Sequence, residues 1–128
     1  MAKKKIRVTI RTLEESFKED MKFASEVDKG IFKKHIPELS FTNFKMYKKM
    51  LTQKRLELLS IIKIKKPKSI KELSVISNRD FKNIYDDIKI LKTLGFVKLK
   101  KSSNGLTPIV LYDEIDIAIK IPIEAISA

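Results

Sequence analysis

The feature that most constrains the fold is a succession of capped helices within residues 52–112 that ends in a turn and two strands. Apolar side chains at helical spacing predict a helix over residues 53–64. A capping-box pattern then opens a short helix over residues 69–77, in which a serine is followed three positions later by a glutamate. A longer helix is expected over residues 79–94, and Gly95 ends it.

The segment after Gly95 predicts a hairpin. An Asn-Gly pair at residues 104–105 separates two stretches, 96–100 and 106–112, that read as strands, and this dipeptide is a strong hairpin signal. Asn78 suits the left-handed turn between the second and third helices. The order of helix, short helix, longer helix and hairpin is that of a winged helix-turn-helix, and we expect an α+β, mainly α fold.

The flanking segments predict further strands and a helix. Residues 5–11 alternate apolar and polar side chains, and in residues 114–123 every second residue is isoleucine, so both stretches read as strands. Between them, residues 13–28 form an amphipathic helical pattern after a capping box, and Ser40 to Asn43 resembles another helix cap. The expected division is therefore an N-terminal strand-helix extension (1–41), a winged helix-turn-helix domain (42–112) and a C-terminal strand and tail (113–128).

Helical spacing also selects the core side chains of the two central helices. On the short helix and the longer helix the residues expected to face inward are Ile70, Leu73, Ile76, Phe81, Ile84, Ile88 and Leu91.

The charge balance points to a polyanion as partner. The 128 residues include 28 Lys and Arg against 16 Asp and Glu, a net charge of +12, which favours nucleic acid first and anionic lipid second. A lysine-rich solvated surface is the alternative explanation. No apolar run approaches the length of a membrane span, and no signal-peptide core follows the basic N-terminus, so we expect a cytoplasmic protein that does not enter membranes.

The sequence offers few residues that could form a catalytic site or bind a metal ion. The chain has no cysteine, which excludes disulfides, thiolate catalysis and Cys-based zinc sites, and the single His35 cannot build a metal site alone. The acidic pairs at 14–15 and 86–87 are adjacent on helices, so their members diverge and do not share one site. We therefore expect no enzyme, no metal and no cofactor.

A winged helix-turn-helix places its recognition helix in the major groove, which selects candidate DNA contacts. Asn83 is suited to pair with adenine, and Lys82 to contact guanine or a phosphate. The N-terminus of the short helix is a candidate phosphate site, and the hairpin is a candidate wing. The candidates are, on the recognition helix, Arg79, Lys82, Asn83, Tyr85 and Lys89; at the phosphate site, Lys68, Ser69 and Lys71; and on the wing, Lys98, Lys100, Lys101, Ser102, Ser103 and Asn104.

Acidic residues on the same helix favour a second hypothesis. Asp80, Asp86 and Asp87 oppose uniform phosphate binding, and Asp87 has no basic residue three or four positions away. The alternative is a protein-interaction module in which DNA contact is incidental. Binding of RNA in place of DNA also stays open.

Several strings resemble a bacterial and archaeal family of winged-helix regulators that is broadly MarR-like. They are Arg79-Asp80-Phe81-Lys82-Asn83-Ile84, Asp87-Ile88-Lys89, Leu91 and Leu94-Gly95, with Leu51-Thr52, Arg55-Leu56-Glu57-Leu58-Leu59, Pro108, Val110, Tyr112-Asp113-Glu114-Ile115 and Leu13-Glu14-Glu15-Ser16-Phe17. The chain departs from the family at Asn78, where glycine is usual.

This resemblance implies a transcriptional regulator, often the antitoxin of a toxin–antitoxin pair. It implies a homodimeric repressor on double-stranded DNA, with residues 5–29 and the isoleucine-rich tail as candidates to cover a toxin. The alternative use of these segments is to complete a dimer, since exposed strand edges pair readily within or between protomers.

Overall fold

The computed structural model describes residues 3–30 and 36–121, so His35, Pro122 and Ile123 lie outside the described residues. Within this part the chain is an α+β protein of five helices and five strands. It forms two compact units, one made of residues 1–49 with 114–128 and the other of residues 50–113.

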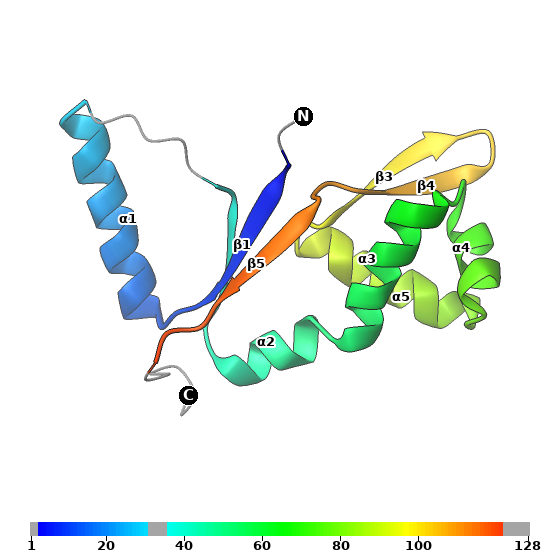
Figure 1. Ribbon diagram of the computed structural model, residues 1–128, viewed down its shortest axis with the longest axis horizontal. Helices are drawn as coiled ribbons and strands as arrows, with labels where there is room; N and C mark the ends of the chain where they lie inside the picture. Colours follow the sequence, from blue (N-terminus) through cyan, green and yellow to red (C-terminus); the bar gives the residue numbers. More distant parts are fainter. Residues whose placement is uncertain (1–2, 31–35, 122–128) are drawn as a thin grey trace. The chain divides into compact units, whose positions relative to one another are not determined.

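The first unit is built on a three-stranded parallel sheet (Figure 1). Its strands are β1 (Lys5–Ile10), β2 (Glu38–Phe41) and β5 (Glu114–Ala118), in the order β2-β1-β5. The chain leaves this unit at Lys49, after β2, and returns to it as β5, so the second unit is inserted in the chain between the two strands that flank β1. The predicted N-terminal and C-terminal strands therefore pair with each other within one chain.

One face of this sheet is apolar. In-register parallel pairing puts Val8 beside Leu39 on one side and beside Ile117 on the other, so these side chains share a face. Ile6, Val8 and Ile10 of the central strand are buried, as is Phe41, whereas Ile117 on the edge strand is exposed. The alternation read from residues 5–11 is thus realised as a strand whose apolar side chains are all buried on one face, while Thr9 on the other face is buried as well.

The opposite face is polar and paired. The hydroxyl groups of Thr9 and Ser40 lie 2.8 Å apart, and the Nζ of Lys5 lies 3.0 Å from the Oε2 of Glu114. The hydrogen bond to Glu114, followed by the negative charges of Glu114 and Asp116, raises the pKa of the Lys5 ammonium above its ordinary value. The pairing of β1 with β5 therefore favours the charged form of Lys5. The ion pair adds to the free energy of unfolding while Lys5 is charged, and this addition is lost as the pH rises through the raised pKa.

Two helices accompany the sheet. Helix α1 (Leu13–Asp28) is capped by Thr12, whose hydroxyl accepts from the backbone N–H of Glu15, as the capping box predicts. Helix α2 (Phe44–Met50) is capped by Asn43, whose Oδ1 accepts from Met46 N–H. Strand β2 was not predicted, because its last two residues were assigned to this cap.

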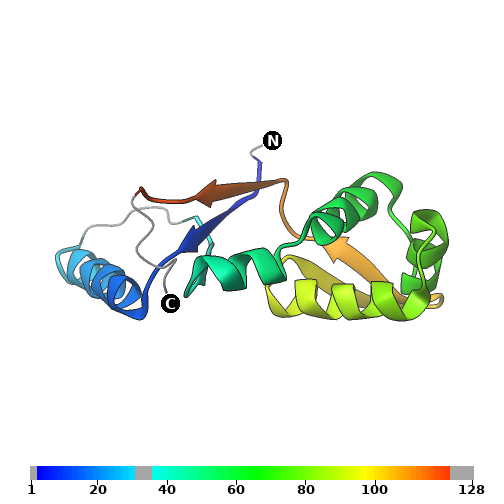
Figure 2. The ribbon, with the colours of Figure 1, turned by 90° about the horizontal axis from the view of Figure 1, so that it is seen from below.

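The second unit confirms the predicted element order. It contains α3 (Gln53–Lys65), α4 (Ile70–Ser77) and α5 (Phe81–Thr93), followed by the antiparallel hairpin of β3 (Val97–Ser102) and β4 (Gly105–Val110). Figure 2 shows α5 in front of the hairpin. Thr52 and Ser69 accept hydrogen bonds at the starts of α3 and α4, and Asn78 ends α4 with a left-handed backbone, φ 54°.

The core of this unit confirms most of the expected inward positions. Leu73, Ile84, Ile88, Leu91 and Ile70 are buried, and Phe96 at the start of the hairpin is fully enclosed. Two expectations are wrong, because Ile76 and Phe81 are exposed. On α4 the third buried residue is Ser74 and not Ile76, and the Ser74 hydroxyl donates to the carbonyl of Lys71.

The boundaries of the units differ from those expected from sequence. The sequence prediction divides the chain after residues 41 and 112, whereas the compact units divide after residues 49 and 113. The C-terminal strand groups with the N-terminal segment because β5 is hydrogen-bonded to β1. Across the described residues, none of the helices combines the length and the apolar character needed to cross a membrane.

We predict that Ile88→Ala lowers the free energy of unfolding by about 2–5 kcal/mol, because it removes a fully buried side chain and leaves a cavity. Ile64→Ala is the matched control, since Ile64 is 74% exposed on α3 and its truncation should change stability by less than about 0.5 kcal/mol. Urea unfolding followed by circular dichroism measures both. Equal losses for the two variants would contradict this core assignment.

Candidate nucleic-acid interface

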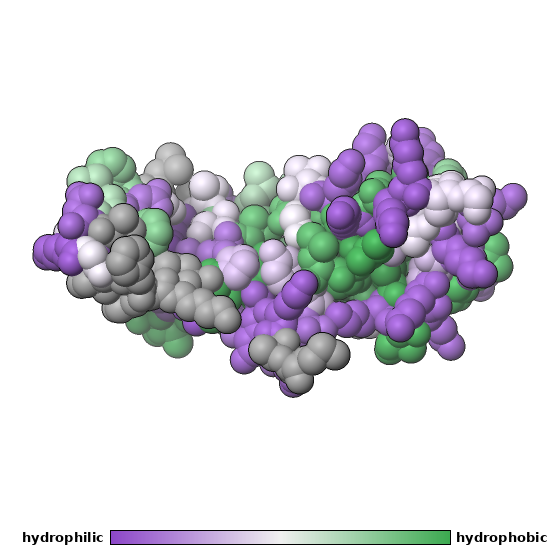
Figure 3. All heavy atoms as spheres, turned by 90° about the horizontal axis from the view of Figure 1, so that it is seen from above, coloured by the Kyte–Doolittle hydropathy of each residue, from purple (hydrophilic) through white to green (hydrophobic). Residues whose placement is uncertain are grey.

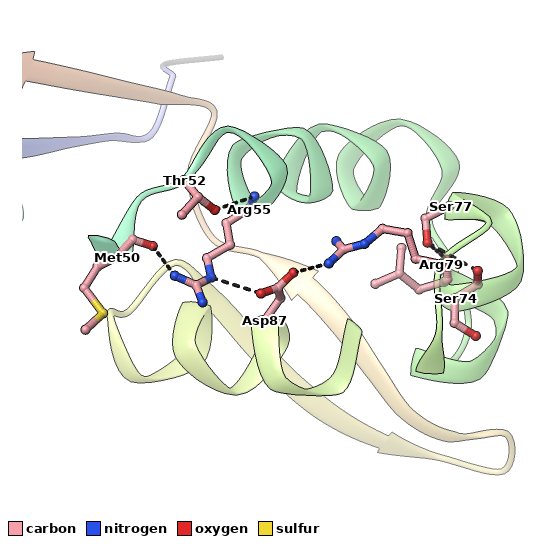
Figure 4. Close-up of polar contacts among 8 residues, drawn as sticks. Met50, Thr52, Arg55, Ser74, Ser77, Arg79 and Asp87 are labelled. Carbon is pink, nitrogen blue, oxygen red and sulfur yellow. Dashed lines mark hydrogen bonds and ion pairs between the residues drawn. The ribbon is translucent and has the colours of Figure 1, made fainter. Parts of the chain in front are cut away.

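The position of α5 depends on a carboxylate shared by two arginines (Figure 4). Asp87 lies on the buried side of α5, and its Oδ1 accepts from Arg55 Nε at 3.0 Å. Its Oδ2 accepts from Arg79 Nη2 at 2.7 Å. Arg55 belongs to α3 and Arg79 to the turn between α4 and α5. The Asp87 side chain therefore links α5 to α3 and to this turn.

Arg55 extends this network to the preceding segment. Its Nη1 donates to the carbonyl of Met50 at 2.9 Å, and its backbone N–H donates to Thr52 Oγ1. The side chains of Arg55 and Asp87 are 15% and 12% exposed, so water screens this ion pair less than a surface pair. Removing one partner would leave a charge in a largely dry place, which is costly.

These contacts give Asp87 two basic partners, although no basic residue lies three or four positions from it on the helix. Helical spacing indicates only partners three or four positions away on the same helix. Arg55 is 32 residues from Asp87 in the sequence, and Arg79 is eight. The negative charge of Asp87 is therefore balanced inside the unit and does not oppose an anion at the surface. Arg79, expected as an exposed contact, is instead partly buried against Asp87.

The outward side of α5 carries the other candidates expected on this helix. Lys82, Asn83, Tyr85 and Lys89 are all exposed. The Nζ of Lys89 lies 5.4 Å from the centre of the Tyr85 ring, a cation–π arrangement. The structure thus exposes four of the five residues expected on the recognition helix, and the fifth, Arg79, lies in the turn before α5.

The hairpin provides a second exposed basic segment. Lys98, Lys100 and Lys101 are exposed on β3, and Ser103 and Asn104 are exposed at its tip. Ser102 has a structural task, because its hydroxyl donates to the carbonyl of Gly105 and accepts from the N–H of Asn104. The hairpin is joined to the core by the bond from Phe96 N–H to the carbonyl of Leu91 and by a second bond, from Thr107 Oγ1 to the carbonyl of Lys68 at 2.6 Å.

The start of α4 is less simple than expected for a phosphate site. Ser69 Oγ accepts from Glu72 N–H at 3.0 Å, as the capping box predicts. The Glu72 carboxylate, however, accepts from Lys68 N–H at 3.3 Å, so an acidic group lies at this helix end. Lys68 and Lys71 are exposed beside it, and the cationic environment is therefore partly offset.

The second unit as a whole is strongly basic. Its 64 residues hold fourteen Lys and Arg and six Asp and Glu, a net charge of +8. All twelve of its lysines are exposed, whereas Asp87 is enclosed. In Figure 3 hydrophilic side chains gather over the part of the molecule that carries the hairpin, around an apolar area. Within the described residues, no group of three or more His, Asp or Glu side chains is placed to hold a metal ion.

Sequence reasoning missed three contributors to this surface. Asp87 and Arg55 position α5, and Thr107 attaches the hairpin to the segment before α4. An aspartate inside the apolar spacing of Ile84, Ile88 and Leu91 was a signal for the first of these, since a buried carboxylate requires a partner. No local pattern indicates which arginine that partner is.

The comparisons with known proteins gave one family. The protein-family model HVO_A0114 matches residues 50–117, slightly more than half of the chain, a range that contains the whole of the second unit. No curated protein and no solved structure matches the chain.

We predict that Asp87→Asn lowers the free energy of unfolding by about 3 kcal/mol, because two arginines lose their shared counter-charge in a partly dry place. Asp86→Asn is the matched control one residue away, where the side chain is exposed and the expected change is below about 0.5 kcal/mol. Thermal unfolding of the two variants gives the comparison. A loss in Asp87→Asn no larger than in Asp86→Asn would contradict the role assigned to this network.

Proposed function

The chain belongs to the HVO_A0114 family, and we propose that residues 50–113 form a winged helix-turn-helix domain that binds double-stranded DNA with sequence specificity. The observation that carries the proposal is the outward side of α5, where Lys82, Asn83 and Lys89 are exposed while Asp87 is enclosed. In this docking the first turns of α5 contact base edges in the major groove, and the lysines of β3 contact phosphates.

The charge of the unit supports the same ligand. A net charge of +8 on a small unit attracts a polyanion of any sequence, whereas an exposed amide such as that of Asn83 distinguishes adenine from other bases. The two features together favour DNA read by sequence over non-specific attachment. The proposed biological role is that of a cytoplasmic, dimeric repressor, acting as the antitoxin that regulates its own operon.

The decisive experiment selects duplexes from a random pool with the purified chain and then measures binding by fluorescence anisotropy. The selected duplex, the DNA upstream of the chain's own gene and a scrambled duplex are compared across a salt series. If the proposal is correct, the chain still binds one duplex sequence at physiological salt and no longer binds the scrambled duplex. Equal, salt-sensitive binding to all duplexes would contradict it and leave only a basic surface.

We predict that Asn83→Ala weakens binding to the selected duplex by about 1–3 kcal/mol and relaxes the base preference at one position, because an amide pairing with a base is lost. Lys101→Ala should weaken all duplexes alike and reduce the slope of log K against log salt by about one, because one phosphate contact is lost. Anisotropy titrations of both variants check this contrast. The docking would be wrong if both variants bound every duplex as the parent does.

Helix α1 favours a second candidate function, which is binding of a protein partner. It carries six acidic and two basic side chains, a net charge of −4 in a chain of +12, so the rest of the chain carries +16. On one side of this acidic helix Phe17 is 66% exposed and Met21 is 57% exposed. A partner that offers basic and apolar groups suits this side, and a second copy of the chain meets that description. A toxin with a basic, apolar surface is the alternative occupant.

We predict that Phe17→Glu shifts the chain from dimer to monomer in analytical ultracentrifugation, because a charge replaces an apolar contact in the interface. Glu19→Ala changes the opposite side of the same helix and should leave the dimer intact. A monomer in both variants and in the parent would exclude self-association through α1. Co-purification of a toxin with the parent and its loss in Phe17→Glu would then identify that protein as the partner.

A further inference from the structure

Helix α5 begins with two aromatic side chains that remain in water. Phe81 is 48% exposed and Tyr85, one turn later, is 38% exposed. Their ring centres are 6.0 Å apart and the ring planes differ by 19°, so the two rings stack on each other. Helical spacing placed Phe81 in the core, but the core of this helix is filled by Ile84, Ile88 and Leu91.

A cation continues this pair along the helix. Lys89 is one turn beyond Tyr85 and its Nζ lies over the Tyr85 ring. Phe81, Tyr85 and Lys89 are spaced by four residues, so they lie in one row on the helix surface. The row presents apolar ring surface at the helix N-terminus and positive charge toward the helix C-terminus.

The surroundings of the rings favour a ligand that is anionic and also carries small apolar groups. Lys82 is exposed beside the row and Lys92 is exposed beyond Lys89 in the same row, and Asp80 and Asp86 are the acidic neighbours. A lone exposed aromatic residue is common on protein surfaces, but a stacked pair flanked by lysines is a specific combination. In the major groove of DNA the small apolar group within a field of phosphates is the C5 methyl of thymine.

We propose that Phe81, held in place by Tyr85, is a specificity-determining residue that contacts the C5 methyl group of thymine. This inference rests on the proposed docking of α5 in the major groove, where residues of the first helical turn meet base edges. Phe81 is the first residue of α5, and a phenyl ring is among the side chains that contact this methyl group. Lys82 and Lys89 would then lie toward the phosphates, and Asn83 toward a neighbouring base.

The test replaces thymine by deoxyuridine, which removes the methyl group and preserves base pairing. In a duplex selected with the parent chain, each thymine is replaced singly and the dissociation constant is measured by anisotropy. The parent should bind about fourfold more weakly at one or more positions, a ratio that corresponds to one methyl-sized apolar contact. Phe81→Ala should bind the thymine duplex more weakly and no longer distinguish it from the deoxyuridine duplex.

Two variants separate this role from a structural one. Phe81→Leu keeps an apolar contact and should retain the preference for thymine, and Asn83→Ala should retain it as well. Circular dichroism and thermal unfolding of Phe81→Ala should match the parent, because the ring is half exposed.

The outcomes separate this inference from the proposed function. If a duplex is bound specifically but no deoxyuridine substitution weakens it, thymine recognition is wrong while the DNA-binding proposal stands. The same holds if Phe81→Ala keeps the distinction between the two duplexes. If no duplex is selected, or if only single strands are bound with no preference between thymine and uracil, both proposals are overturned.

Discussion

The interaction on which the second unit depends is the carboxylate of Asp87 between Arg55 and Arg79. Apolar packing by Ile84 and Ile88 gives α5 a buried side but tolerates small rotations and shifts along the helix axis. A carboxylate that contacts two guanidinium groups tolerates far smaller displacements of the helix. Each displaced contact leaves a charge without its partner at a position that is largely shielded from solvent. We infer that this network sets which side chains of α5 face outward.

The same network determines the electrostatics of the surface. Placing Asp87 inside removes a negative charge from the outward side of α5, where Lys82 and Lys89 remain. The cost is that Arg79 is drawn inward and is less available to a ligand than its place in the sequence suggests. The charge contrast is local, since the inserted unit carries +8 and the first unit +4, and the acidic excess is confined to α1, which carries −4. This contrast supports the proposals of a nucleic-acid ligand for the inserted unit and of a protein partner for α1.

Local signals in the sequence were sufficient for most of the fold. Thr52 and Ser69 cap their helices through contacts three residues away, and Asn78 and Gly95 end helices through their own backbone preferences, so each is readable from a short window. Strand β2 was missed because four residues are too few to establish an alternation, and its pairing with β1 is a long-range contact. The partner of β5 was undetermined for the same reason.

The candidate site was less predictable than the fold. Periodicity identifies the apolar stripe of α5 but not where it ends, so Phe81 at its margin was assigned to the core although it is half exposed. The pairing of Asp87 with Arg55 joins residues 32 positions apart, and no spacing rule within one helix detects it. Exposure of Lys82, Asn83 and Lys89 followed from the same periodicity and agrees with the structure, because none of these positions falls within the spacing of Ile84, Ile88 and Leu91.

The measurement that tests the central claim most directly is a titration of the isotope-labelled chain with a short DNA duplex, followed by amide chemical shifts in two-dimensional NMR. The account predicts that the largest changes fall on the first turns of α5 and on residues 98–104 of the hairpin, while α1 is unaffected. Changes concentrated on α1 or β5, or spread evenly over all exposed lysines, would contradict it.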